Sequence, residues 1–212
     1  RQMCRRARFG LLVTGEIFVR NLGGFDAISQ LFDNAWHLGI IRKFVETGNY
    51  STLQSGNIVP TIGSTFYPTG WHSLVALTMS ATGAGIGVAE NAVNTLIIGI
   101  VFPLSMLTFL VVIFRDRYDV LLASAAVPLM FAAYPWRFLT FGPLYSNLLS
   151  FAVLPAAMAT LMLILDANSS LRERIRYGAV FIISLVGVAM TQPNAVFTLG
   201  VLLVPYLFMQ IP

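Results

Sequence analysis

The two histidines of the chain each follow a tryptophan directly, and both lie in the one long polar segment between the hydrophobic runs. The first histidine is part of FDNAWHLG at residues 32–39, and the second is part of FYPTGWH at residues 66–72. In a helix, Asp33 and His37 would lie one turn apart on an apolar face, where the carboxylate and the imidazole can hydrogen-bond. Their apolar neighbours indicate a cleft or a packed interface rather than an open surface.

The second histidine is expected in the first turn of another helix. Pro68 is favoured in a first turn, and the following GWHSLVALTMSATG continues a helical pattern until glycines end it. At a helix start, the positive end of the helix dipole disfavours protonation of His72 and favours a bound anion. The two Trp-His segments therefore combine a carboxylate–imidazole pair with a possible anion site.

Two further elements must position these groups. Ile28–Thr47 is predicted to form a helix that ends at Gly48, because glycine commonly terminates helices. Tyr50–Thr65 is rich in Ser, Thr, Gly and Asn and is predicted to form a loop. This loop is long enough to bring the second Trp-His segment back to Asp33.

Each of these residues also has a structural interpretation, which the sequence alone leaves open. Asp33 can pair with Arg42, Lys43 or His37, and both histidines can be ordinary hydrogen-bonded residues. Tryptophans near membrane ends commonly form an interfacial aromatic belt. The structural interpretation covers Trp36, Trp71, Tyr134, Trp136 and Tyr145 as belt residues, Arg137 as an interfacial anchor, and Glu90 and Asn94 as polar groups at a helix start.

The composition places these segments in a membrane protein. The chain has 212 residues, of which 57% are hydrophobic and 10% charged, whereas soluble domains carry roughly 25% charged residues. The mean hydropathy is +0.77. About 20 apolar residues cross a bilayer as a helix. An all-α, polytopic transmembrane helix bundle is predicted from five apolar stretches: Ala92–Phe114, Val120–Trp136, Leu148–Leu165, Gly178–Met190 and Ala195–Ile211.

Proline positions predict where the spans bend and turn. Pro103 is expected to kink the first span, where neighbouring helices must accommodate it. TQPN at residues 191–194 favours a tight turn between the last two spans. The fourth stretch is short for a span, so it is expected to extend over Tyr177 and Thr191.

Arginine positions predict the orientation, since short loops rich in Lys and Arg stay in the cytoplasm. The connections RDRYD and DANSSLRERIRY are basic, whereas the alternate connections carry only Arg137. Residues 20–91 are therefore expected to form a large first extracytoplasmic loop with surface-lying, juxtamembrane helices, and residues 92–212 a bundle of about five spans. Residues 1–19 are either a tail or the end of a preceding membrane segment. The protein is expected in the cell membrane, multi-pass, with the candidate site on the extracytoplasmic side.

Several classes of function are disfavoured. Cys4 is the single cysteine, and the chain contains no CxxC or HExxH motif, so no disulfide or zinc framework is predicted. The net charge of +4 comes from loop and tail arginines without the basic and aromatic clustering of a nucleic-acid site. The chain begins with Arg1 and ends in an apolar run, so we expect it to be part of a larger protein.

Three short motifs carry a resemblance to a known family. They are a D-x3-H-L stretch from Asp33 to Leu38, an ETG turn at residues 46–48, and a YP-x2-WH stretch from Tyr67 to His72. In a large first outer loop ahead of a multi-span bundle, this pattern resembles the GT-C superfamily of integral-membrane glycosyltransferases, in particular an uncharacterised actinobacterial-type branch. The resemblance covers residues 26–77 specifically and the remaining spans generically.

The resemblance implies transfer of a sugar from a polyprenyl-phosphate-linked donor to a glycan, lipid or protein acceptor at the outer face of the membrane, with inversion. Asp33 would then be the catalytic base and His37 would orient or tune it. His72, the helix start near Trp71, and Arg137 would meet the phosphate or the sugar. The flat faces of Trp36, Tyr67 and Trp71 would contact a sugar ring or the isoprenoid chain.

The chain also departs from the GT-C pattern. Many members carry paired acids in the first loop, whereas Asn34 follows Asp33 here, and the loop RFLTFGPLYSN offers no acid that could share a metal. A divalent metal cofactor is therefore possible in the family but has no convincing ligand set in this sequence. The usual C-terminal external domain of the family is not recognised in this sequence. The alternatives are a transporter or lipid flippase, which should carry ionisable residues at mid-bilayer depth, and a noncatalytic scaffold of cell-envelope assembly.

Overall fold

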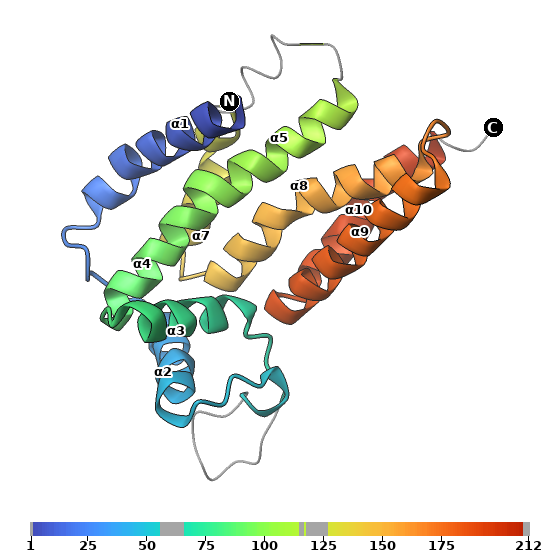
Figure 1. Cartoon of the computed structure of the whole chain (residues 1–212). Coiled ribbons are helices and arrows are strands. Elements are labelled where there is room, and N and C mark those ends of the chain that lie inside the picture. Colours follow the sequence, from blue (N-terminus) through green and yellow to red (C-terminus); the bar gives the residue numbers. More distant parts are fainter. Residues whose placement is uncertain (1, 56–65, 115–116, 118–126, 210–212) are drawn as a thin grey trace.

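A computed structural model of the chain describes residues 2–55, 66–114, 117 and 127–209 (Figure 1). Every regular element in these residues is helical, as the sequence predicts. The longer helices are α1 (Gln2–Ile17), α2 (Phe32–Thr47), α3 (Gly70–Thr82), α4 (Ile86–Leu96), α5 (Phe102–Ile113), α8 (Tyr145–Leu165), α9 (Leu171–Thr191) and α10 (Asn194–Phe208). The short segments are η1 (Val19–Asn21), η2 (Thr52–Gln54), η3 (Ile97–Val101), η4 (Val127–Met130), η5 (Ala132–Trp136) and α7 (Arg137–Thr140).

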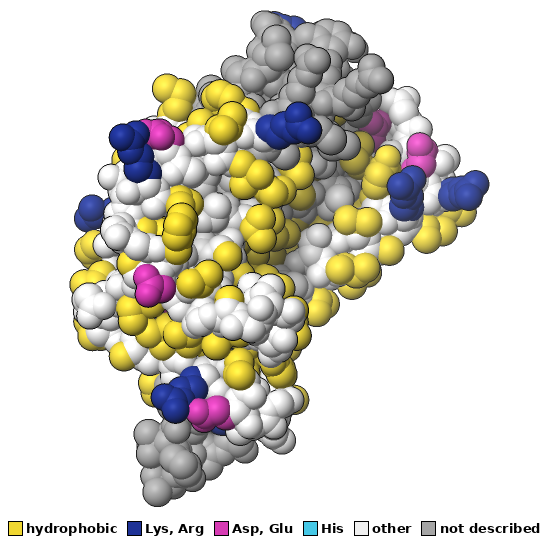
Figure 2. All heavy atoms as spheres, turned by 60° about the vertical axis from the view of Figure 1, so that its left-hand side comes forward, with side chains coloured by type: hydrophobic (Ala, Val, Ile, Leu, Met, Phe, Trp, Pro, Cys, Tyr) yellow, Lys and Arg dark blue, Asp and Glu magenta, His cyan; other side chains and the backbone are white. Residues whose placement is uncertain are grey.

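Three helices in the described residues are long and apolar enough to cross a membrane, and α10 is a shorter apolar helix. The three are the continuous helix Ile86–Ile113, α8 and α9. Large apolar side chains on α9 and α10 stay exposed, including Ile183 at 72% and Phe197 at 77%. Figure 2 shows hydrophobic side chains spread over one face of the molecule, with the charged side chains mostly toward its margins. Exposed apolar surface of this extent is compatible with a membrane protein.

The first predicted span is present and starts earlier than expected. Helix α4, the π-helical turn η3 and α5 form one continuous helix from Ile86 to Ile113, whereas the sequence predicted Ala92–Phe114. Pro103 has no backbone N–H, and in an unbroken α-helix its ring would clash with the preceding turn. The wider turn η3 directly before Pro103 accommodates it.

The fourth predicted span needs a correction at its start. The sequence predicted Gly178–Met190, with a loop before it, but α9 begins at Leu171 and includes the arginine-rich residues. A capping box fixes this start: the Glu173 N–H donates to Ser170 Oγ at 3.3 Å, and the Ser170 N–H donates to Glu173 Oε2 at 2.9 Å. At the other end, the predicted turn at TQPN is confirmed between α9 and α10.

The second predicted span, Val120–Trp136, is not a spanning helix where the structure describes it. Its first part, residues 120–126, lies outside the described residues. From Val127 onward the chain forms the short segments η4 and η5, and Tyr134 within η5 is extended, with φ −137° and ψ +131°. Pro135 explains this break, because a residue before proline is pushed out of the helical region.

Helices α2 and α3 pack against each other at one end of the long helices, the lower end in Figure 1. The predicted ends are confirmed: Gly48 and Gly83 follow α2 and α3 in the left-handed conformation, with φ of +66° and +71°. Helix α2 starts at Phe32, later than the predicted Ile28. The α2–α3 pair belongs to a core cluster that includes Ile40, Ile41, Phe44, Trp71, Val75, Val93, Tyr145 and Leu148.

Residues 2–17, whose placement the sequence left open, form helix α1, which packs against η3 and α5. The backbones approach closely at Gly10, where a Cβ atom would collide with the carbonyl of Gly99. Small residues permit such close packing of helices in a bilayer. Helix α1 is therefore part of the bundle in this structure.

Candidate functional site

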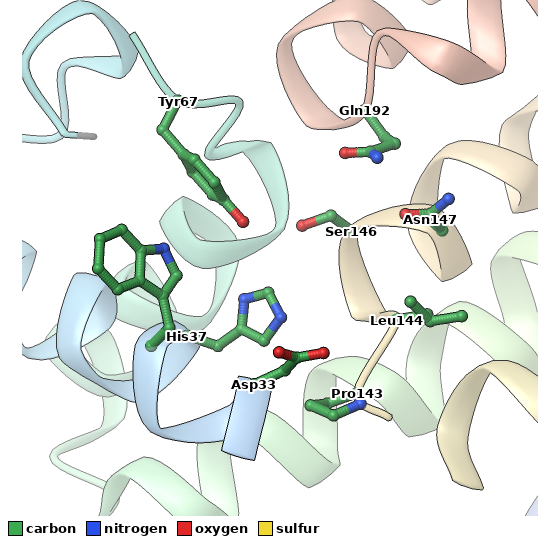
Figure 3. A pocket seen from close by; sticks show the side chains of 9 residues that line it. Asp33, His37, Tyr67, Pro143, Leu144, Ser146, Asn147 and Gln192 are labelled. Carbon is green, nitrogen blue, oxygen red and sulfur yellow. The ribbon is translucent and has the colours of Figure 1, made fainter. Parts of the chain in front are cut away.

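A polar cavity of about 280 Å³ lies where α2, α8 and the turn after α9 meet, beside the segment that leads into α3 (Figure 3). This volume is close to the lower limit of ligand pockets, roughly 300–1,000 Å³. The cavity is lined by Asp33, Trp36, His37, Tyr67, Pro143, Leu144, Ser146, Asn147 and Gln192. Four of the seven site residues predicted from the sequence, Asp33, Trp36, His37 and Tyr67, therefore come together around one cavity.

Asp33 lies in the first turn of α2, with an exposed side chain that faces this cavity. Figure 3 shows its carboxylate between His37 and Pro143. Gly142, just before Pro143, is a neighbour of Asp33, since a Cβ atom there would make an ordinary van der Waals contact with Oδ2 at 3.6 Å. Because the Asp33 side chain is exposed and lines the cavity, its carboxylate can reach a ligand there without any change of fold.

His37 is almost fully buried and hydrogen-bonds to His72: His37 Nδ1 lies 2.8 Å from His72 Nε2. The Pro143 carbonyl lies near enough to His37 to raise its pKa, and a carbonyl can only accept. This favours the tautomer in which His37 Nε2 carries its proton toward Pro143, while His37 Nδ1 accepts from His72 Nε2. The remaining nitrogen, His72 Nδ1, is buried without a partner among the described residues. A second proton there would have no acceptor.

Both imidazoles are accordingly held in the neutral form. Burial lowers the pKa of His37 from its ordinary value of 6.5, although the Pro143 carbonyl and the charge of Asp33 act in the opposite direction. Burial, followed by repulsion from His37, lowers the pKa of His72 well below 6.5. At neutral pH the pair therefore acts as a hydrogen-bonded support for the Asp33 side of the cavity and carries no positive charge.

Trp71 and His72 lie behind the cavity, with 0% of each side chain exposed. The Trp71 Nε1–H donates to Asn94 Oδ1 at 3.0 Å, which ties the start of α3 to α4. Neither residue is among the described residues that line the cavity. The structure thus places His72 behind the cavity, where its ring contacts the rings of His37 and Tyr67.

Trp36 and Tyr67 form an aromatic wall on one side of the cavity. Their ring centroids lie 6.4 Å apart in an edge-to-face arrangement. Burial, and then the charge of Asp33, raise the pKa of the Tyr67 hydroxyl from its ordinary value of 10.0. Tyr67 therefore stays protonated at neutral pH and offers an O–H donor to the cavity.

Arg137 is placed apart from the other predicted site residues. It begins α7, its side chain is exposed, and its guanidinium carbon lies 4.8 Å above the ring of Phe141. It is not among the described residues that line the cavity. The sequence alternative, an interfacial anchor, stays a prediction.

The structure adds Ser146, Asn147 and Gln192 to the cavity, and sequence reasoning did not select them. The polar YSN directly after Pro143 and Leu144 was a usable signal, since polar residues at the start of an apolar helix are free to face a ligand. Gln192 lies in the TQPN turn, which the sequence predicted only as a connection. Its approach to α2 depends on tertiary packing.

A second polar cluster lies deeper, inside the bundle. Glu90 of α4 is 0% exposed, and both carboxyl oxygens lack a well-aligned hydrogen bond within the described residues. Its nearest polar neighbours are Tyr145 of α8 and Asn34 of α2. The sequence had interpreted Glu90 as a polar group at a helix start, but it is a buried acid that links three helices.

No group of three or more His, Cys, Asp or Glu side chains in the described residues is close enough to hold a metal ion. The described residues therefore offer no ligand set of this kind for a divalent metal.

The fold and the cavity together define an all-helical protein with apolar helices long enough for a membrane and a small polar cavity at one end of them. Residues 7–212 match the model of a family of unknown function, DUF6541, and the chain belongs to this family. No curated protein and no solved structure matches the chain.

Proposed function

We propose that the protein is a membrane glycosyltransferase of the GT-C type, which moves a sugar from a polyprenyl-phosphate-linked donor to a hydroxyl acceptor. The observation that carries the proposal is the accessible carboxylate of Asp33 in a small polar cavity, next to the aromatic wall of Trp36 and Tyr67. Aromatic faces and a few polar groups in a concave site are typical of ligand recognition. The cavity also lies at one end of helices suited to a membrane, where a lipid-linked donor would present its sugar.

In the proposed reaction, Asp33 accepts the proton of the acceptor hydroxyl as that oxygen attacks the anomeric carbon. The bond between this carbon and the phosphate oxygen breaks, and its electron pair leaves with the phosphate. Attack from the face opposite the phosphate inverts the configuration. General-base help of this kind contributes roughly 10²–10⁴-fold to a rate.

The histidines support this chemistry by position. His37 lies one turn from Asp33 on α2 and is fixed by its hydrogen bond to His72. Because both imidazoles are held neutral, they do not neutralise Asp33 by forming an ion pair with it. Trp71 and His72 act through His37 on the cavity, and Arg137 is left to anchor α7 at the membrane interface.

The arginine distribution supports an outer location for the cavity. The basic residues of α9 lie in its first turns, while the cavity touches the residue that follows its last turn, Gln192. If the arginine-rich end stays in the cytoplasm, the cavity faces the extracytoplasmic side in a multi-pass arrangement. The proposed partners are therefore the lipid-linked donor, membrane lipids and an acceptor outside the cytoplasm.

The test is transfer of labelled sugar from a polyprenyl-phosphate donor by the full-length protein in membranes. Asp33→Asn keeps the shape of the side chain and removes the base, so turnover should fall roughly 10²–10⁴-fold with donor binding retained. Asp26→Asn is the matched control, an exposed acid ahead of α2 that is not among the described cavity residues, and it should transfer sugar at the wild-type rate. Wild-type turnover by Asp33→Asn at equal protein level would exclude Asp33 as the base.

Transport of a lipid-linked sugar is the second candidate, and Glu90 is the observation that favours it. A fully buried acid in a candidate membrane span is costly and commonly marks a pathway for an ion or a substrate. Transport predicts that the donor crosses the bilayer of protein-containing vesicles without sugar transfer, and that this movement depends on Glu90 rather than on Asp33. Sugar transfer dependent on Asp33 would decide for the enzyme.

A further inference from the structure

Helix α8 begins at the wall of the Asp33 cavity, and its first turn is uncapped. In the described part of the chain, no side chain caps this helix. The backbone N–H groups of Tyr145, Ser146 and Asn147 have no hydrogen-bond acceptor there. The helix is 21 residues long, so it carries a full dipole with its positive end at these groups. Unsatisfied N–H groups at such an end are suited to an anion.

Ser146 provides a second, independent observation at the same place. Its side chain is 6% exposed, and Oγ is buried without a hydrogen-bond partner among the described residues. Ser146 nevertheless lines the cavity, and Figure 3 shows its hydroxyl pointing toward the hydroxyl end of Tyr67. Burying an unpaired hydroxyl costs free energy, so this group is arranged to bind something that enters the cavity.

The surrounding side chains add neutral donors. Tyr67 presents an O–H, and Asn147 and Gln192 present side-chain amides to the same cavity. None of the described lining residues is Lys or Arg, and His37 is held neutral. An anion would thus be held by hydrogen bonds and the helix dipole, as in other sites built on helix starts.

The position of Asp33 decides where the anion lies. Asp33 is on α2, across the cavity from the start of α8 in Figure 3, and its charge would repel an anion bound next to it. An anion at Ser146 therefore leaves the space nearer Asp33, Trp36 and Tyr67 for the uncharged part of the same ligand. A phosphate ester fits this division, because several oxygens can accept from several donors while its organic group extends away.

We propose that the start of α8, with Ser146 at its centre, is the phosphate-binding subsite of this protein. That the bound phosphate belongs to a polyprenyl-linked ligand rests on the proposed function. That the ligand is a phosphate rests on the uncapped helix and the unpaired Ser146 hydroxyl. This assignment differs from the one made on sequence, which placed the phosphate or the sugar at Arg137, His72 and the helix start near Trp71. That start is closed to ligands, since Thr69, Trp71 and His72 are each 0% exposed.

The test measures binding of a short-chain polyprenyl monophosphate to the full-length protein in nanodiscs. The uncharged polyprenol of the same chain length is the reference ligand, and inorganic phosphate is the competitor. Ser146→Ala removes one donor to a charged group and should weaken binding of the monophosphate roughly tenfold. Ser146→Asp puts a carboxylate at the helix start, which favours the helix itself but repels the ligand, and should weaken binding more than Ser146→Ala does.

Ser150→Ala is the matched control. Ser150 is one turn further along α8, equally buried, and its hydroxyl donates to the Ser146 carbonyl at 3.0 Å. This variant should bind the monophosphate as the wild type does. Unchanged thermal unfolding of Ser146→Asp would show that its lost binding is not lost folding.

Preference of the wild type for the monophosphate over the polyprenol, together with loss in Ser146→Asp, supports the subsite. If inorganic phosphate displaces the monophosphate, the subsite recognises phosphate alone. If it does not, the subsite recognises the phosphate as part of a lipid headgroup. Equal binding of monophosphate and polyprenol, or wild-type binding by Ser146→Asp, would overturn the proposal. The proposed function is tested separately, because Asp33→Asn should lower transfer roughly 10²–10⁴-fold and leave this binding intact.

Discussion

Helices α3 and α8 begin beside the same ring, that of His37, but their first turns have different surroundings. The His37 ring centroid is 5.0 Å from that of His72 in the first turn of α3, and 6.3 Å from that of Tyr145 at the start of α8. At α3, Gly70 presses against Thr191, and the hydroxyls of Thr69 and Thr52 are bonded to each other at 3.0 Å. At α8, the hydroxyl of Ser146 is left unpaired at the cavity.

This difference teaches that a helix dipole makes a binding site only where the helix start can be reached. Both starts carry the same partial charge, yet the α3 start is filled by protein groups and the α8 start adjoins a cavity. We therefore expect substitutions at the α3 start to change stability first, and substitutions at the α8 start to change ligand binding first.

The largest effect should come from Trp71→Ala at the α3 start. Trp71 is fully buried and bonded to Asn94, and removing a buried tryptophan costs roughly 3–5 kcal/mol. Denaturant or thermal unfolding of the protein in detergent measures the loss. Trp36→Ala is the matched control, since Trp36 is 38% exposed, and it should cost far less stability. Equal losses in the two variants would contradict the distinction between a closed helix start and an open cavity wall.

The part of the fold that could be predicted from the sequence is the part set by local rules. Glycine at Gly48 and Gly83 ended α2 and α3 as expected, and the four-residue spacing placed Asp33 and His37 on one side of α2. The start of α9 was missed because the charge of Leu171–Tyr177 was taken to indicate a connection between two spans. The capping box of Ser170 and Glu173, also a local signal, would have identified it.

The missed parts of the site depend on contacts between distant segments. Ser146 and Gln192 share a cavity with Asp33 because α8 and α9 pack against α3, and the spacing of residues along the sequence does not predict such packing. Glu90 was visible in the sequence, but its burial follows from the packing of α4 against Asn34 and Tyr145. In the described part of the second predicted span, Val127–Trp136, hydropathy also missed the break, because a sum over apolar residues ignores the effect of Pro135 on the residue before it.

An intermediate effect is expected for His72, which bridges the α3 start and the cavity. His72→Ala leaves His37 Nδ1 without its donor in a buried place, at a cost of roughly 1–3 kcal/mol in unfolding free energy. His72→Gln can still donate from its amide and should recover most of this loss. If sugar transfer is measured as well, His72→Ala should also change its pH profile, since His37 is then free to take a proton. Equal stability of the Ala and Gln variants would show that the bond to His37 adds nothing.

The smallest effect should be the pH dependence of stability that the two histidines cause. Their pKa values in the folded protein are lowered from 6.5, so between these values and 6.5 the unfolded chain binds protons that the folded chain does not. The contribution of the two neutral imidazoles to the free energy of unfolding is therefore fully present above about pH 7, and it falls as the pH drops below 6.5. The effect is modest for His37, because Pro143 and Asp33 partly offset its burial.

Unfolding midpoints between pH 5 and pH 8, compared with those of the His37→Gln/His72→Gln double variant, isolate this contribution. The chain has only two histidines, so the double variant keeps every carboxylate and loses every imidazole. The wild type should lose more stability than the variant on acidification, and the difference in stability between the two should become independent of pH above pH 7. A wild type that gains stability relative to the variant at low pH would mean that the imidazoles are charged in the folded state. The start of α3 would then be an anion site in competition with the start of α8.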